Sequence, residues 1–126
     1  MRQSGVGFPI KQRGLLLRAV WVAWLCLVTI GSLLPSSSPL LALFDRAGVS
    51  DKALHFSSYF LAALLPVLGL STRRRGLIAA CLMAVLGLAL EAAQDIVPGR
   101  TVEVGDLIAN QLGVLCGMLV GLGFRP

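Results

Sequence analysis

The residues of this sequence that could carry out chemistry are few, and their spacing suits helices. Asp51, His55 and Tyr59 follow one another at intervals of four, so in a helix they lie along one side. Glu91 and Asp106 add carboxylates later in the chain. A histidine beside carboxylates can act as a general base, bind a ligand or hold a divalent cation. The first question is therefore whether these groups share one site.

Composition places the elements that carry these residues in a membrane. Of 126 residues, 56% are hydrophobic and 13% are charged, whereas soluble domains have about 45–50% and about 25%. A soluble protein of this length could not bury so much apolar surface, so the lipid bilayer is the expected partner. The net charge of +5 does not indicate nucleic-acid binding, because the basic residues flank apolar segments instead of forming a patch with aromatic residues.

Four apolar segments have the length that a helix needs to cross the bilayer. They cover about residues 15–34, 53–70, 77–94 and 107–124. We therefore predict an all-α fold, a four-transmembrane-helix bundle, as a single domain over residues 1–126. The first segment is expected to be retained as a span and not cleaved as a signal peptide, because its apolar run is long and no clear cleavage motif follows it.

The basic residues predict how the bundle is oriented. Eight of them lie near the start of the first span, between the second and third spans, or after the fourth: Arg2, Lys11, Arg13, Arg18, Arg73, Arg74, Arg75 and Arg125. Three lie at the opposite ends: Arg46, Lys52 and Arg100. The positive-inside rule therefore places both termini in the cytoplasm, and we expect a multi-pass protein of the cytoplasmic (inner) membrane.

With this topology, the ends of three spans meet on the extracytoplasmic side, where all six acidic residues also lie. Counting about 1.5 Å per residue along each helix brings residues of different spans to similar depths. We predict that an inner polar layer and an outer rim of polar residues together form one ligand-binding site. The inner layer is His55, Glu91, Gln94 and Asn110, with Tyr59 one turn below His55, and the rim is Asp51, Lys52, Asp95, Arg100 and Asp106.

Glu91 is the member of this set that is hardest to explain by structure alone. It lies near the C-terminal end of a span, where a negative charge opposes the helix dipole by about 0.3–1 kcal/mol. Burial in a membrane adds a few kcal/mol unless the carboxyl group is protonated or paired. His55, Lys52 and Arg100 are the available partners, and Arg100 could also form a two-pronged contact with Asp95 or an anionic ligand.

Structural roles remain open for the other members. Asp51 and Asp106 each begin a helix and could cap its free amides. Asn110 and Gln94 could form hydrogen bonds between helices, and Tyr59 could be a packing aromatic. Catalytic roles, if there are any, would fall to His55, Glu91 or Asp106.

Three glycines of the last span, Gly113, Gly117 and Gly121, have the spacing that lets another helix approach closely. That helix could be internal or belong to a second chain, so an oligomer through these glycines is considered. In the second span, Pro66 is expected to kink the helix and to free the carbonyl of Ala62.

We predict no metal site and no cofactor. Cys26, Cys81 and Cys116 lie in separate spans, without the CxxC or Cys/His spacing that is typical of zinc sites. One histidine with several carboxylates could hold a divalent cation, but no ligand spacing supports it strongly.

The order of the polar motifs resembles the VanZ-like family of small membrane proteins. The family pattern is D-K-x-x-H-F-x-x-Y, then E-x-x-Q, a loop arginine, and D-x-x-x-N-x-x-G. The matching segments are DKALHFSSY (51–59), EAAQ (91–94), PGR (98–100) and DLIANQLG (106–113), within about residues 51–120. The family is named for a protein associated with teicoplanin resistance, so the resemblance implies a role in glycopeptide resistance, without a settled biochemical activity.

Two classes of function, and a third alternative, follow from these residues. The favoured one is a non-enzymatic protein that binds a lipid-linked envelope precursor or an amphiphilic antibiotic, with Arg100 and Lys52 holding anionic groups. The second is an intramembrane enzyme in which His55 or Glu91 acts as a general base, and Asp106 orients it or binds a cation. The third is a scaffold whose polar layer only fixes helix register.

Overall fold

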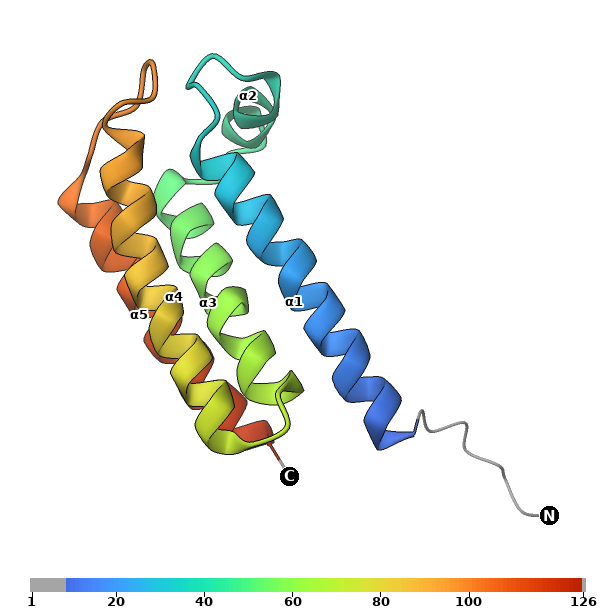
Figure 1. The fold of residues 1–126 in the computed structure, drawn as a ribbon. Helices are drawn as coiled ribbons and strands as arrows, with labels where there is room; N and C mark the ends of the chain where they lie inside the picture. The colour runs from blue at the N-terminus through green and yellow to red at the C-terminus, as the bar shows by residue number, and fades with distance from the viewer. Residues whose placement is uncertain (1–8, 126) are drawn as a thin grey trace.

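The computed structural model describes residues 9–125, and the regular structure in this range is entirely helical. The helices are α1 (Ile10–Ser32), α2 (Pro39–Arg46), α3 (Asp51–Gly69), α4 (Arg73–Gln94) and α5 (Val104–Phe124), as Figure 1 shows. All except α2 are long and apolar enough to cross a membrane. The predicted all-α fold with four spans is confirmed, while the assignment of the termini to the cytoplasm stays a prediction.

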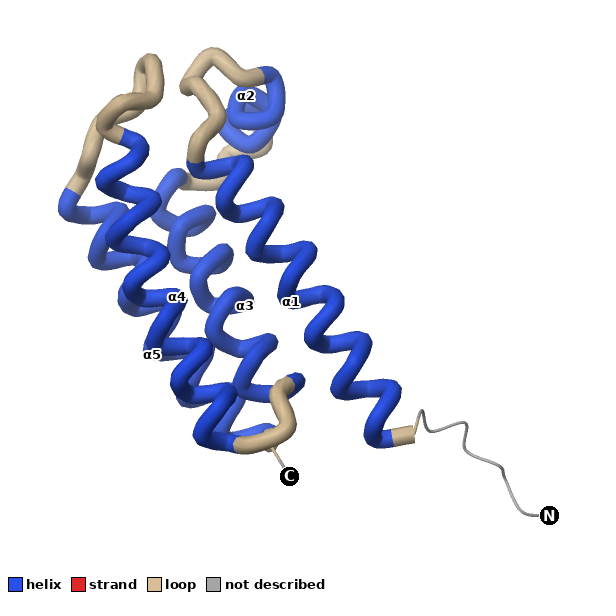
Figure 2. The backbone as a smooth tube through the Cα atoms, viewed as in Figure 1, coloured by secondary structure: helices blue, strands red, loops and turns tan. Residues whose placement is uncertain are grey.

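The four long helices run side by side, with α2 and the α4–α5 loop at one end of the bundle (Figures 1 and 2). We call this the α2 end; the ends of α1 and α4 and the starts of α3 and α5 lie there. The turn between α3 and α4 lies at the opposite end. The predicted meeting of three span ends is therefore present, and it also includes α1.

The sequence analysis missed the short helix α2. Its eight residues are too few to cross a bilayer. Pro39 occupies the first turn, where a proline is well tolerated because its missing N–H would have no helical partner. The first span also differs, since α1 begins at Ile10 instead of residue 15.

The glycines of α5 allow it to pack closely against α3. A Cβ atom at Gly113 would collide with the carbonyl oxygen of Phe56, and one at Gly117 with that of Phe60. Gly121 is also buried against α3. The partner helix is therefore internal, and an oligomer formed through this stripe would first have to separate α5 from α3.

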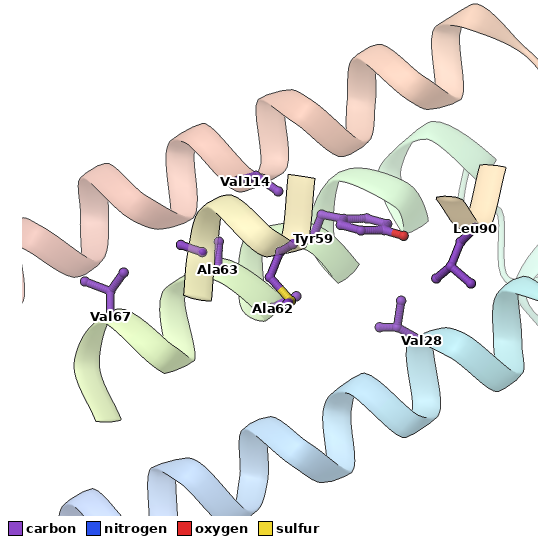
Figure 3. Close-up of a cluster of buried hydrophobic side chains, with 9 residues drawn as sticks. Val28, Tyr59, Ala62, Ala63, Val67, Leu90 and Val114 are labelled. Carbon is purple, nitrogen blue, oxygen red and sulfur yellow. The ribbon is translucent and has the colours of Figure 1, made fainter. Parts of the chain in front are cut away.

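Small side chains dominate the buried centre of the bundle. The cluster in Figure 3 consists of Val28, Tyr59, Ala62, Ala63, Val67, Ala80, Met83, Leu90 and Val114. Large aliphatic side chains such as Leu82, Val85 and Leu119 are exposed on the outside. This distribution is typical of helices in lipid, where association depends on close backbone approach and not on the burial of large apolar groups.

Side chains of α1 bond to carbonyl groups of α3. Pro66 lies inside α3 and has no N–H, so the carbonyl of Ala62 lacks its usual helical donor. Trp21 Nε1 donates to that oxygen over 2.9 Å, and Trp24 Nε1 donates to the carbonyl of Ser58 over 2.9 Å. The carbonyl that the sequence predicted to be free is thus bonded by a neighbouring span.

Two arginines bond to the carbonyls at the C-terminal end of α3. Arg18 Nε donates to Gly69 O over 3.0 Å. Arg125 donates to Val67 O through Nη1 and to Leu70 O through Nη2, the latter over 2.9 Å. These carbonyls lie in the last turn, where helix carbonyls have no partner within the helix.

The close approach of α5 to α3 predicts the effect of a single methyl group. We expect Gly117→Ala to lower the free energy of unfolding by about 1–3 kcal/mol, because the new methyl group meets the Phe60 carbonyl and pushes the helices apart. Gly123→Ala is the matched control, since a Cβ there meets nothing within 4 Å. Thermal unfolding in detergent, followed by circular dichroism, measures both. Equal stability of the two variants would show that the close approach is not required.

Candidate functional site

The imidazole of His55 lies among polar groups at the α2 end. Its Nδ1 atom is 2.7 Å from Oδ1 of Asn110 on α5. Because an amide oxygen only accepts hydrogen bonds, Nδ1 is the donor in this contact. The other ring nitrogen, Nε2, is 3.8 Å from Asp51 Oδ2 and 3.8 Å from Asp106 Oδ2. His55 therefore links α3 to α5 and faces two carboxylates.

Lys52 of α3 bridges two carboxylates at the start of α5, and one of them is again Asp106. Its Nζ atom is 2.6 Å from Glu103 Oε2 and also contacts Asp106 Oδ1. The side chains of Lys52 and Glu103 are about half exposed, whereas that of Asp106 is only 6% exposed. Asp106, predicted for the outer rim, thus belongs to the buried layer, between Lys52 and His55.

Neither Asp51 nor Asp106 caps the helix that it begins, a role that the sequence analysis left open. Ser50 caps α3, because its side chain accepts a hydrogen bond from the N–H of Ala53. Asp51 follows Ser50 in the first turn of α3, where the helix dipole favours a negative charge. The carboxylate of Asp51 faces His55. Asp106 likewise lies in the first turn of α5 and does not cap it.

Glu91 is buried with an incomplete set of hydrogen-bond donors. Only 3% of the residue is exposed, and its Oε1 atom accepts a long bond of 3.4 Å from the backbone N–H of Glu103. Its Oε2 atom is buried and accepts no hydrogen bond from any residue in the range 9–125. Within that range, neither His55 nor Lys52 forms an ion pair with it.

Gln94 and Arg100 bond to the C-terminal end of α1. Gln94 Nε2 donates to Ser32 O over 3.0 Å. Arg100 donates through Nε to Leu34 O over 3.0 Å and through Nη2 to Gly31 O over 3.1 Å. These two side chains therefore supply donors to carbonyls in the last turn of α1 and just beyond it, and the charge of Arg100 also favours the negative end of the helix dipole.

These bonds differ from the contacts with Glu91 and Asp95 that the sequence analysis considered for Arg100. The structure describes no ion pair between Arg100 and either Glu91 or Asp95 within residues 9–125. Asp95 is exposed, and in the same range its side chain forms no hydrogen bond. Arg100 donates to backbone carbonyls because α1 ends beside it. The spacing of residues in the later part of the sequence does not reveal that α1 ends there.

A pocket of about 260 Å³ lies beside these groups. Five of the candidate residues line it: Asp51, His55, Tyr59, Gln94 and Arg100. Its apolar walls include Trp24, Leu27 and Val28 of α1 and Leu40, Leu41 and Phe44 of α2. The predicted alignment of Asp51, His55 and Tyr59 along one side of a helix is therefore confirmed, and that side faces a pocket.

Comparison with known families gives one match that covers most of the chain. A family model described as VanZ/LLP1 matches residues 11–125. The chain belongs to the VanZ/LLP1 family. The match confirms the resemblance seen in residues 51–120 and extends it through α1. Comparisons with curated proteins and with solved structures find no significant match.

The four candidate spans and the family together identify a multi-pass membrane protein of the VanZ/LLP1 family. In this protein, the sequence analysis missed the part of the pocket formed by α1 and α2. The segment PLLALFDR carried a signal, because its proline start and its apolar residues at positions 40, 41 and 44 are typical of a short amphipathic helix. It also missed Glu103 as the partner of Lys52.

The contacts of Arg100 predict a stability effect in this VanZ/LLP1 protein. We expect Arg100→Ala to lower the free energy of unfolding by about 1–3 kcal/mol, because it removes the donors to Gly31 O and Leu34 O. Arg46→Ala is the control, since Arg46 is an exposed arginine at the same end of the bundle. Thermal unfolding in detergent compares the two variants with the parent. A variant Arg100→Ala as stable as Arg46→Ala would contradict this role.

Proposed function

We propose that this VanZ/LLP1 protein binds an amphiphile in the pocket at the α2 end. The ligand is a lipid-linked envelope precursor or an amphiphilic antibiotic, and binding contributes to glycopeptide resistance or cell-envelope maintenance at the cytoplasmic (inner) membrane. The observation that supports this most is the lining of the pocket, which joins apolar walls from α1 and α2 to a polar side formed by Asp51, His55 and Arg100.

The volume of the pocket suits part of an amphiphile. Small-molecule sites usually measure about 300–1,000 Å³, and this pocket, at about 260 Å³, is slightly smaller. It therefore has room for a head group and the first part of a chain, while the rest of the ligand stays in the bilayer. Leu41 and Phe44 of α2 and Trp24 of α1 offer the apolar contacts that such a chain needs.

Arg100 supplies the positive charge for a polar or anionic head group. Its guanidinium has five N–H donors, of which two bond to Gly31 O of α1 and to Leu34 O just after it. Arg100 also lines the pocket, and these two bonds leave three of its N–H donors for a ligand. Lys52, which was also expected to hold anionic groups, pairs with Glu103 and Asp106 and does not line the pocket. We therefore assign the ligand contact to Arg100 and a supporting role to Lys52.

The positions of His55 and Glu91 do not favour a joint acid–base role for these two residues. An acid–base pair would have to reach the same substrate. His55 lines the pocket, whereas Glu91 does not. A scaffold that only fixes helix register would not need a pocket with one apolar and one polar side.

Narrowing the pocket should reduce the amount of bound amphiphile. Leu41→Trp adds bulk inside the pocket, while Leu43→Trp adds the same bulk on the outer side of the same helix, where Leu43 is 62% exposed. We expect the amphiphile that co-purifies per chain, measured by mass spectrometry, to fall at least fivefold in Leu41→Trp and to stay at the parent level in Leu43→Trp.

A second arm of this experiment separates the two ligand sources. Purified parent and Leu41→Trp are each incubated with teicoplanin, and bound antibiotic is measured by equilibrium dialysis. Loss of co-purifying lipid alone would identify a lipid-linked ligand, and loss of bound teicoplanin would identify the antibiotic. Equal contents of both ligands in Leu41→Trp and Leu43→Trp would refute the proposal.

A further inference from the structure

We propose that Asp51, His55 and Asp106 bind a divalent cation. This goes beyond the proposed function and does not depend on it, because the ion can be tested without any amphiphile. The sequence analysis predicted no metal site, because no spacing typical of metal ligands supports one, and Asp106 lies far along the chain from Asp51 and His55. The packing of α5 on α3 removes that separation.

The distances between the three side chains suit one ion. His55 Nε2 is 3.8 Å from an oxygen of each aspartate, and the three ligand atoms all lie within 4.8 Å of one another. Ligand atoms that each lie about 2.0–2.5 Å from one ion are themselves separated by about 3–5 Å. One imidazole and two carboxylates form a ligand set that is common for divalent transition metals. An ion between them therefore needs little movement of the helices.

A residue outside the three ligands orients the imidazole. Asn110 is 1% exposed and holds the proton-bearing Nδ1 atom of His55 over 2.7 Å. In the neutral imidazole this leaves a lone pair on Nε2, which is the atom that faces Asp51 and Asp106. Histidines that bind metals usually donate their other N–H to an oxygen in this way.

Charge around the three residues also favours a cation. Asp51 and Asp106 both face His55, and Glu103 shares the ammonium group of Lys52 with Asp106, so three carboxylates lie around one lysine. A bound divalent cation would offset this excess of negative charge.

Lys52 does not occupy the proposed position. Its ammonium contacts Oδ1 of Asp106, whereas the oxygen that faces His55 is Oδ2. The side chain of Asp51 is 56% exposed, so an ion can enter from that side and keep water ligands there. The side chains of His55 and Asp106, at 10% and 6% exposed, form the inner part of the site.

The test measures ion binding by the whole purified chain, with any affinity tag removed. The protein is treated with EDTA in detergent, desalted, and dialysed against chlorides of Mg²⁺, Ca²⁺, Mn²⁺ or Zn²⁺ in separate experiments. Elemental mass spectrometry then counts bound ions. We expect one ion per chain for at least one of these metals, and at least tenfold weaker binding in Asp51→Asn and in His55→Ala.

Asp45→Asn is the matched control, because it removes a carboxylate from the same end of the bundle but outside the three ligands. We expect it to bind the ion as the parent does. Asp51→Asn is the decisive variant, since Asp51 is exposed and forms no hydrogen bond with residues 9–125, so its loss should not prevent folding. No bound ion in the parent, or equal affinity in the parent and Asp51→Asn, would overturn the proposal.

Discussion

A backbone carbonyl in the hydrocarbon of a membrane has no water to bond, so it must find a donor within the protein. A helix satisfies most of its own carbonyls but not those of its last turn, nor the one four residues before a proline. In this protein, side chains from other segments bond to these carbonyls. Trp21 bonds to the one released by Pro66, Arg18 bonds to one at the end of α3, and Gln94 and Arg100 bond to Ser32 O and Gly31 O at the end of α1.

The same contacts place the candidate site. Gln94 and Arg100 hold the end of α1 against α4 and the α4–α5 loop, and both also line the pocket. His55 and Lys52 connect α3 to α5 through Asn110 and Asp106, where the glycines of α5 allow the backbones to approach. The polar residues therefore have structural and ligand-facing roles at once, which is why assigning each to one role from the sequence was difficult.

Depth along a helix could be predicted from the sequence, because the rise per residue is constant. This gave the four spans, the alignment of Asp51 with His55, and the meeting of α3, α4 and α5 at one end. Rotation about each helix axis, and the path of the loops, depend on packing between segments that are distant in the chain. For that reason the burial of Asp106 and the carbonyl partners of Arg100 could not be predicted. The short helix α2 was missed because the sequence was searched only for segments long enough to cross a membrane.

One consequence concerns α1, which lies at the edge of the bundle beside α3 (Figure 1) and buries only one residue, Val28. Aliphatic contacts alone would hold such a helix weakly, because acyl chains compete equally well for its surface. The hydrogen bonds that Arg18, Trp21 and Trp24 donate to α3 are directional. They therefore set both the position of α1 along the bundle axis and its rotation about its own axis. The span that contributes least to the core is thus the one whose placement depends most on the exact atoms it bonds.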